Sequence, residues 1–280
     1  MNNHCKFCNK KFKSSFYAYN FLNKKKLGKF KICLKCKINI QPKLFYNLYS
    51  NQKSSNYNLG KNIFFYLKQI IFIYYIFKFK KFLDKKKNIL DYGCGSGELA
   101  NSLSNIYKYK NIYTSDVFII SKKFIPKVKN HFLIDDQKLV NKKFDVIFVR
   151  HVLEHIYDLK KFIKKIKNNL KNKNSILFIE VPNENSFWKT IMQKRWPGYF
   201  YPFHYYVFSE KFLTYFFLKN RLKIIKSFNL EPPVIGTYLS TFGIPILICK
   251  ILSIFLYPIQ LLMSKLFFKS EAIMFVVKKY

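Results

Sequence analysis

Three glycines at alternate positions follow an apolar run in the stretch ILDYGCGSGEL, residues 89–99. Gly93, Gly95 and Gly97 stand where a strand-like segment gives way to a helical pattern. Because glycine has no Cβ, such a loop lets the backbone approach a ligand closely and presents N–H groups at a helix start. The spacing is G-x-G-x-G, whereas dinucleotide-binding folds show G-x-G-x-x-G. The stretch therefore predicts a ligand-binding turn of a different kind.

Acidic residues close the strands expected on either side of this loop. Asp91 ends the first strand and can receive an ammonium group, and Asp116 ends the second and can accept both hydroxyls of a ribose. Asp135 and Asp136 end the third, where a carboxylate can hold an exocyclic adenine amine. In a doubly wound sheet, ligands bind at the carboxyl ends of the strands. Together these residues suit a ligand with an amino acid, a ribose and an adenine but no pyrophosphate.

Four cysteines near the start of the chain have the spacing of a metal site. Cys5 and Cys8 form one C-x-x-C pair, and Cys33 and Cys36 form another after 24 intervening residues. Four thiolates of this kind close a structural Zn²⁺ site with no open coordination position, so we expect the ion to fold the module and not to catalyse. An iron–sulfur or redox role is the alternative.

The elements that must position these residues alternate between strands and helices. Apolar strands are predicted at 87–93, 111–117, 129–136, 143–151, 175–183, 221–228 and 271–280. Helices are predicted at 63–83, 97–107, 157–172 and 209–220, the last with Ser209 as its N-cap. This order indicates an α/β fold with a mostly parallel sheet and helices on both faces. The expected domains are a zinc-binding module at 1–45, a linker and packing helix at 46–87, a nucleoside-binding domain at 88–231 and 269–280, and an apolar helical insertion at 232–268.

The whole pattern closely resembles the class I S-adenosylmethionine-dependent methyltransferases. The matching motifs are ILDYGCGSGEL, YTSDV, LIDDQKL, FDVIFVRHVLEHIYD and ILFIEVPNENS, over residues 57–280 with the insertion unmatched. The resemblance implies a Rossmann-like seven-stranded sheet with an antiparallel last strand, and methyl transfer from S-adenosylmethionine (SAM). By motif it assigns cofactor binding to Asp91, Gly93, Gly95, Gly97 and Asp116, and the adenine edge to Asp135 or Asp136. We add Cys94, as a small residue packed beside the ligand, and Arg150, although Arg150 departs from the small or neutral residues more usual at that position.

Candidate catalytic residues follow the fourth strand and the fifth. Glu154 and His155 lie in RHVLEHIYD, where His155 is a candidate base and a packing or capping role is the alternative. His204 lies in a long aromatic segment that we interpret as a substrate-binding loop and lid. The residues of that segment expected to touch an acceptor are Trp188, Arg195, Trp196, Tyr199, Tyr201 and His204. A related sugar C-methyltransferase family also pairs an N-terminal zinc module with this domain, but it carries a further C-terminal domain, so we expect the analogy to be partial.

Charge and hydropathy point to an anionic surface. The chain has 51 basic and 14 acidic residues, a net charge of +37, but its only arginines are Arg150, Arg195 and Arg221. Base readout favours Arg, so sequence-specific nucleic-acid binding is not expected. Pro245, Lys250 and Pro258 break the apolar segment 232–268 and argue against a single membrane span. We expect residues 238–268 to dock on an anionic membrane, or else to cap the domain or form a dimer.

These observations give one leading function and two alternatives. The leading hypothesis is methyl transfer to a small-molecule, sugar or lipid-linked acceptor in glycan or envelope biosynthesis. The alternatives are an RNA methyltransferase that uses the zinc module, and an inactive SAM-fold zinc scaffold. The RNA hypothesis is weakened because FVRHVLEH stands where base-amine methylases show an Asn-Pro-Pro-aromatic motif. Since MNNHCKFCNKKFK has no apolar signal region, we expect a cytoplasmic protein, with peripheral attachment to the inner membrane face as a hypothesis.

Overall fold

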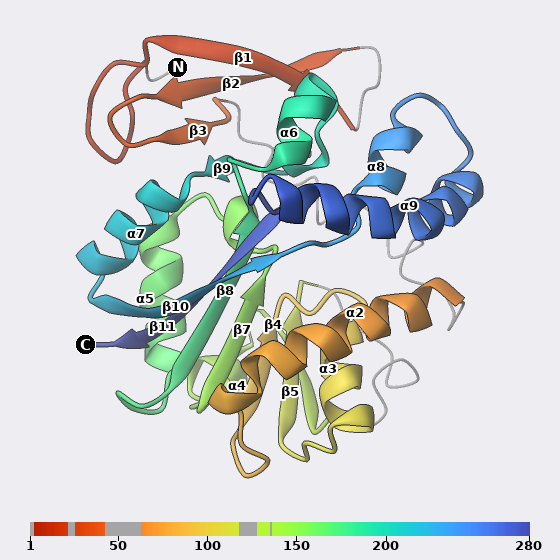
Figure 1. The fold of residues 1–280 in the computed structure, drawn as a ribbon. Helices are drawn as coiled ribbons and strands as arrows, with labels where there is room; N and C mark the ends of the chain where they lie inside the picture. Colours follow the sequence, from red (N-terminus) through yellow and green to blue (C-terminus); the bar gives the residue numbers. More distant parts are fainter. Residues whose placement is uncertain (1–2, 22–25, 43–62, 118–127, 135) are drawn as a thin grey trace.

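The protein contains two β-sheets, a large one and a small one that lies above it in Figure 1. The structure is a computed structural model that describes residues 3–21, 26–42, 63–117, 128–134 and 136–280. The linker expected at 46–62 lies outside the described residues.

The large sheet has seven strands in the order β10-β11-β8-β7-β4-β5-β6. All its neighbouring strands pair in parallel except β11, which runs antiparallel to both β8 and β10. This confirms the predicted α/β fold with an antiparallel last strand. The strands are β4 (Ile89–Tyr92), β5 (Ile112–Asp116), β6 (Asn130–Leu133), β7 (Val146–Arg150), β8 (Ile176–Pro182), β10 (Leu222–Leu230) and β11 (Ala272–Lys279).

Helices cover both faces of this sheet because successive side chains of a strand point to opposite faces. Val146 and Phe148 of β7 pack on one face with α2 (Ile63–Phe79) and α3 (Glu98–Asn101). Ile147 and Val149 pack on the other, with α5 (Leu159–Asn169) and α7 (Glu210–Lys219). The central strands of the sheet are therefore buried on both sides, as their near-continuous apolar runs predict, whereas the edge strands β10 and β6 are largely exposed.

The predicted N-cap of α7, Ser209, is confirmed, and Asp158 caps α5 in the same way. The Asp158 carboxylate accepts a hydrogen bond from the Lys161 N–H, and the Ser209 hydroxyl accepts one from the Phe212 N–H. Such caps satisfy donors that the first helical turn leaves unpaired. Shorter helical segments are η2 (Lys80–Phe82), the π-helix η3 (Ser102–Ile106), α4 (Gln137–Val140), η4 (Leu153–His155), α6 (Phe187–Met192), η5 (Gln193–Arg195) and η6 (Pro197–Tyr199).

The N-terminal module is not a separate unit. Its strands β1 (Ser14–Tyr19), β2 (Leu27–Cys33) and β3 (Ile38–Ile40) form an antiparallel sheet. A fourth strand, β9 (Tyr206–Phe208), comes from the aromatic segment after β8 and pairs with β3. Figure 1 shows β9 between the red module and the rest of the fold. The sequence concealed this link because β9 has only three residues.

The insertion is helical, and only one of its two expected proline breaks, Pro245, separates helices, whereas Pro258 does not. α8 (Ile235–Ser240) is followed by α9 (Ile246–Leu266), a helix of 21 residues that continues through Pro258. Pro245 occupies the N-cap position, and Pro258 removes one interior N–H without ending the helix. α9 is long and apolar enough to cross a membrane by length and composition, and only 11% of its most apolar window is buried.

Candidate active site and cysteine cluster

The glycine loop is a tight turn whose backbone only glycine adopts readily. Gly93, Gly95 and Gly97 have φ values of 69°, 55° and 79°, in the left-handed region. A Cβ on Gly93 would lie 2.3 Å from Cγ2 of Val152, so the chain also requires glycine there for space. The N–H groups of Gly93 and Cys94 both donate to the Ser115 carbonyl, which fixes the loop against the end of β5.

Asp116 connects the glycine loop with the second strand. Its Oδ2 accepts the Gly95 N–H at 2.8 Å, and its Oδ1 accepts the Val117 N–H at 2.7 Å. The loop and the predicted ribose-binding acid are thus held in one rigid arrangement.

The buried carboxyl of Asp91 interacts electrostatically with the largely buried guanidinium of Arg150 near the neighbouring ends of β4 and β7. Burial raises the pKa of Asp91 to about 7, against the opposing effect of the positive charge on Arg150. Arg150 in turn donates through Nε to Glu180, which lies directly opposite it in the β7–β8 register. The charges of Arg150 and His151 lower the pKa of Glu180 to about 2 in spite of its burial. Arg150 and Glu180 therefore form a fixed ion pair, whereas the Asp91 carboxyl changes its protonation state near pH 7.

Asp91, Arg150 and His151 line one cavity of about 530 Å³ at the carboxyl ends of the parallel strands. A cavity of this size falls within the range for small-molecule sites. Of the residues predicted to bind cofactor, six lie in its wall: Asp91, Gly93, Cys94, Gly95, Asp116 and Arg150. Burial raises the pKa of Cys94, which keeps its thiol protonated and consistent with packing beside a ligand.

Three other predicted cofactor residues have different positions. Gly97 is the N-cap of α3 and is not part of the cavity wall. Asp136 is the N-cap of α4, where its carboxylate accepts the Lys138 N–H, and it is not part of the cavity wall. Ile134 takes the corresponding place in the wall, because it directly follows β6. Asp135 lies outside the described residues.

The predicted catalytic residues are brought together beside this cavity. His155 lines it, while Glu154 and His204 lie behind His155. The His155 and His204 rings meet edge to face at 4.6 Å, and Nε2 of His204 is 4.0 Å from Oε1 of Glu154. Burial is the main cause that lowers the pKa of His155, and it lowers that of His204 to about 3. Both imidazoles are therefore neutral at physiological pH.

His151 completes a charged network that sequence reasoning only partly anticipated. Its Nδ1 lies 3.3 Å from Glu154 and its Nε2 lies 3.2 Å from Glu180. The two carboxylates raise the pKa of His151 to about 10, although burial opposes this. Glu180 was not predicted as a site residue. The signal was present, because an acid within the apolar run of β8 requires a buried cation as its partner.

None of the six residues of the aromatic segment that were expected to touch an acceptor lines this cavity, and five of them make structural contacts elsewhere. The Trp196 indole donates to Glu271, the Trp188 indole donates to Ser264, and Arg195 donates to the Thr241 carbonyl. Tyr199 and Tyr201 pack with Phe30 of β2. These side chains join the module, the insertion and the sheet, since a buried aromatic with a polar tip needs both apolar packing and a hydrogen-bond partner.

Other residues of the same segment take the predicted place in the cavity wall. Pro202, Phe203 and Tyr205 line it, together with Phe72 of α2. The Arg150 guanidinium lies 4.4 Å from the Phe72 ring centroid, a cation–π contact that forms one side of the cavity. The aromatic composition could locate the lid in the sequence, but not which of its rings face inward.

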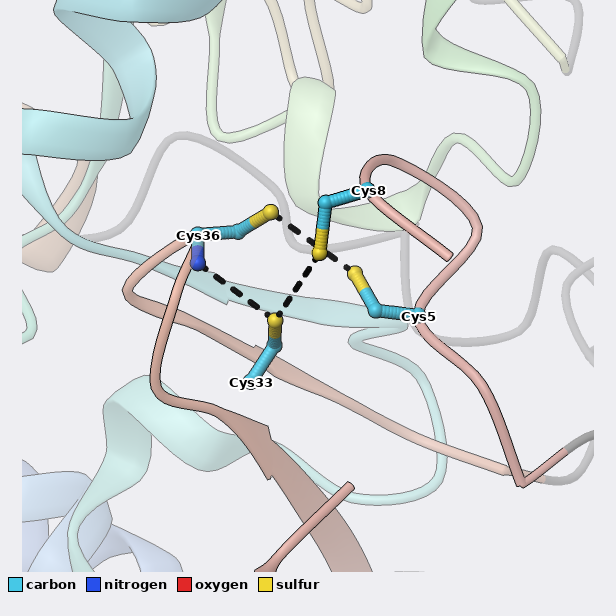
Figure 2. A group of neighbouring side chains, drawn as sticks. All are labelled: Cys5, Cys8, Cys33 and Cys36. Carbon is cyan, nitrogen blue, oxygen red and sulfur yellow. Dashed lines mark hydrogen bonds between the residues drawn. The ribbon is translucent and has the colours of Figure 1, made fainter. Parts of the chain in front are cut away.

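The four N-terminal cysteines converge, as Figure 2 shows. Sγ of Cys5 lies 3.8 Å from Sγ of Cys36, and Sγ of Cys8 lies 3.6 Å from Sγ of Cys33. A tetrahedral Zn²⁺ with Zn–S bonds of about 2.3 Å places its sulfurs about 3.8 Å apart. All four cysteines are free thiols and not disulfides. The donor set and its spacing therefore fit a four-thiolate ion.

Comparison with known families agrees with the geometry of the glycine loop and its cavity. Residues 71–227 match the model of a methyltransferase domain family, which covers more than half of the chain. The chain belongs to this methyltransferase-domain family. The N-terminal cysteine module lies outside the matched residues.

Individual relatives are distant. An N-methyltransferase 4 of Papaver somniferum is 29% identical over 111 residues, and the match covers 33% of this chain and 29% of that protein. The chain thus matches less than a third of this curated relative. A SAM-dependent methyltransferase of Archaeoglobus fulgidus is 16% identical, with a TM-score of 0.50 over 75% of this chain and 94% of that one. A candidate methyltransferase of Bacillus halodurans C-125 is 14% identical, with a TM-score of 0.50 over 73% and 98%. Both structures share the fold of the large sheet.

Proposed function

We propose that this protein transfers a methyl group from SAM to a small-molecule acceptor bound in the same cavity. The observation that carries the proposal is the bond from the Gly95 N–H to Asp116, which joins the glycine turn to the ribose-side acid in the cavity wall. The methyltransferase family match and the N-methyltransferase similarity support the same reaction class. SAM would supply an electrophilic methyl group.

The residues of the wall suit the parts of SAM in order. Asp91 would receive the ammonium of the methionine part, and Arg150 its carboxylate, because the two side chains lie at neighbouring strand ends. Asp116 would receive the ribose hydroxyls, and the open backbone at Gly95 would lie under the sugar. Ile134 would contact the adenine with its apolar side chain. His155, backed by Glu154 and His204, would act on the acceptor nucleophile from the opposite part of the wall.

Binding of SAM tests this assignment directly. Calorimetry should show one SAM per chain, and Asp116→Ala should weaken binding by about 10- to 150-fold, since hydrogen bonds to charged groups contribute about 1.5–3 kcal/mol each. Asp136→Ala is the matched control, because its carboxylate caps α4 outside the cavity. Failure of the wild-type protein to bind SAM would favour the inactive-scaffold hypothesis. Salt-dependent retention of RNA, with methylation of that RNA, would favour the RNA alternative.

The cysteine cluster has a structural role in this proposal. Cys5, Cys8, Cys33 and Cys36 would hold one Zn²⁺ and thereby fix the turn that leads into β3. Each coordination position would be filled by a thiolate, so the ion would stabilise the fold and take no part in methyl transfer.

The insertion supports a further part of the proposal, docking on an anionic membrane. The buried residues of α9 are Cys249, Gln260 and Ser264, whereas its exposed ones are aliphatic or aromatic apart from Lys265. This is the reverse of an ordinary surface helix, whose apolar stripe faces the core. A net charge of +37 adds attraction to anionic headgroups. The acceptor would then be a sugar or lipid-linked molecule of envelope biosynthesis, reached from the inner membrane face.

Vesicle flotation tests the membrane part separately from catalysis. The full chain should float with vesicles that contain anionic lipid and less with neutral ones. A variant with Leu247→Gln, Phe255→Gln and Leu262→Gln changes three side chains that are 60%, 74% and 56% exposed. It should remain in the soluble fraction and still bind SAM. Equal flotation of both proteins, or a wild-type dimer that does not float, would reject membrane docking.

A further inference from the structure

Two histidines near the cavity are each fixed by a backbone carbonyl. Nδ1 of His155 lies 2.9 Å from the Phe203 carbonyl oxygen, and Nδ1 of His204 lies 2.9 Å from the Gly198 carbonyl oxygen. A carbonyl can only accept, so each contact selects the tautomer with its proton on Nδ1 and its lone pair on Nε2. Backbone contacts of this kind orient histidines that bind metals.

Glu154 adds a carboxylate that protein donors leave incompletely satisfied. The residue is fully buried, and its Oε2 has no hydrogen-bond partner among the described residues. Its Oε1 lies 3.3 Å from Nδ1 of His151 and 4.0 Å from Nε2 of His204. A buried acceptor without a donor is costly, and a bound cation would satisfy it.

The three residues therefore bring one carboxylate and two imidazoles together. A potential ligand atom of each of Glu154, His155 and His204 lies within 4.8 Å of those of the other two. Metal–ligand bonds of about 2.0–2.2 Å span at most about 4.4 Å between opposite ligands, so binding needs only a small closure.

We propose that Glu154, His155 and His204 bind a second metal ion, distinct from that of the cysteine cluster. Two imidazoles and one carboxylate suit a first-row divalent ion such as Mn²⁺, Fe²⁺ or Zn²⁺ better than Mg²⁺ or Ca²⁺, which prefer oxygen ligands alone. Three protein ligands leave coordination positions open, as in catalytic metal sites. Because His155 lines the cavity, an open position there would face the acceptor.

This site deepens the proposed function, and its role toward the acceptor rests on that function. An acceptor hydroxyl or amine bound to the ion would lose its proton more readily. His155 would then be a ligand and not the base. The preferred acceptors would carry a metal-binding group, such as vicinal hydroxyls or a hydroxyl beside a carbonyl, next to the methylated atom.

Mn²⁺ is a suitable probe because it favours nitrogen and oxygen ligands over the thiolates of the cysteine cluster. Titration of the full chain, followed by electron paramagnetic resonance of free Mn²⁺, should show one bound ion per chain. Glu154→Gln and His204→Gln should each weaken binding at least tenfold. His131→Gln is the matched control, since His131 lies on β6 and contacts Thr114. Calorimetry with SAM verifies that each variant retains its fold.

The outcomes separate this inference from the proposed function. Loss of Mn²⁺ binding in both variants, with SAM binding intact, supports the site. The site is overturned if wild-type protein that binds SAM binds no Mn²⁺ and binds only one Zn²⁺ or Co²⁺ per chain. That single ion would be identified as the one in the cysteine cluster by the ultraviolet charge-transfer bands of metal–thiolate bonds. Equal Mn²⁺ binding by wild type and both variants also overturns the site. Absence of SAM binding with Mn²⁺ binding retained would reject the methyltransferase proposal and leave the metal site in place.

Discussion

At the residue scale, the glycine turn combines two separate requirements. Gly93 has a left-handed backbone and also lies against Val152, whereas Gly95 has a left-handed backbone with no atom within 4 Å of an added Cβ. The two positions therefore separate backbone strain from steric exclusion.

Alanine substitutions should show this separation. Gly93→Ala adds a clash to the strain and should lower the free energy of unfolding by about 2–5 kcal/mol. Gly95→Ala carries the strain alone, about 1–2 kcal/mol. Chemical denaturation of both variants measures the difference, and equal losses would contradict the crowding at Val152.

The raised pKa of Asp91 predicts how the stability of the protein depends on pH. Its folded pKa is about 7, above its ordinary value of 3.8, because it is buried. Its contribution to stability is therefore fully present below its unfolded pKa and is lost as pH rises through about 7. The ligand-free protein should lose stability from about pH 4 to pH 7, and Asp91→Asn should reduce this slope. SAM affinity should change in the opposite direction and increase with pH, since the ionised carboxylate binds an ammonium group. Thermal unfolding and calorimetry over the same pH series measure both trends.

At the element scale, α9 is held by polar contacts on its buried side. Gln260 is fully buried, donates to Glu231 and the Pro232 carbonyl, and accepts the Val234 N–H. Gln260→Leu leaves these groups without a partner and should cost about 2–4 kcal/mol in the free energy of unfolding. Its neighbour Leu261 is exposed, so Leu261→Gln should change stability by less than about 0.5 kcal/mol. Denaturation of the pair tests the orientation of the helix, and similar losses in both would contradict it.

Most elements were predictable because their patterns are local. The apolar strands β4, β5, β7 and β8 and the amphipathic helix α5 follow from spacing alone. The glycine turn and Asp116 followed from their positions at strand ends. The continuity of α9 through Pro258 did not follow, because a proline within a helical pattern ordinarily indicates that the helix ends or kinks there. The inward rings of the lid also escaped prediction, because η5 and η6 change the direction of the chain between Trp188 and Tyr205.

At the scale of the whole molecule, the cysteine module and the cavity are mechanically connected. β9 ends the segment that carries Phe203, His204 and Tyr205, and it pairs with β3 next to the cysteine cluster. The Ser209 hydroxyl, at the N-cap of α7, also donates to the carbonyl of Lys37, which directly follows Cys36. Loss of order in the module should therefore also increase the mobility of the cavity wall.

Loss of the proposed zinc tests this connection. Cys36→Ser should lower zinc content, reduce the melting temperature and increase hydrogen exchange at β3, β9 and residues 202–205. Cys249→Ser is the control, because Cys249 is a buried thiol of α9 outside the cluster. Unchanged exchange at β9 in a zinc-free variant would show that the module and the cavity are independent. The variant tests the cysteine site alone, whereas a chelator would also remove any ion bound at Glu154, His155 and His204.

The β3–β9 pair also constrains the order of events during synthesis. Ile40 pairs with Tyr206, so the edge of β3 has no native partner until the ribosome has added more than 160 further residues. At about 5–20 residues per second this interval is roughly 10–30 s. Throughout it the nascent module carries an open strand edge, which is a template for pairing with other chains. Early binding of Zn²⁺ by the thiols would fix this edge in a short, ordered form, and the last part of the cavity wall would close only after the lid segment had left the ribosome.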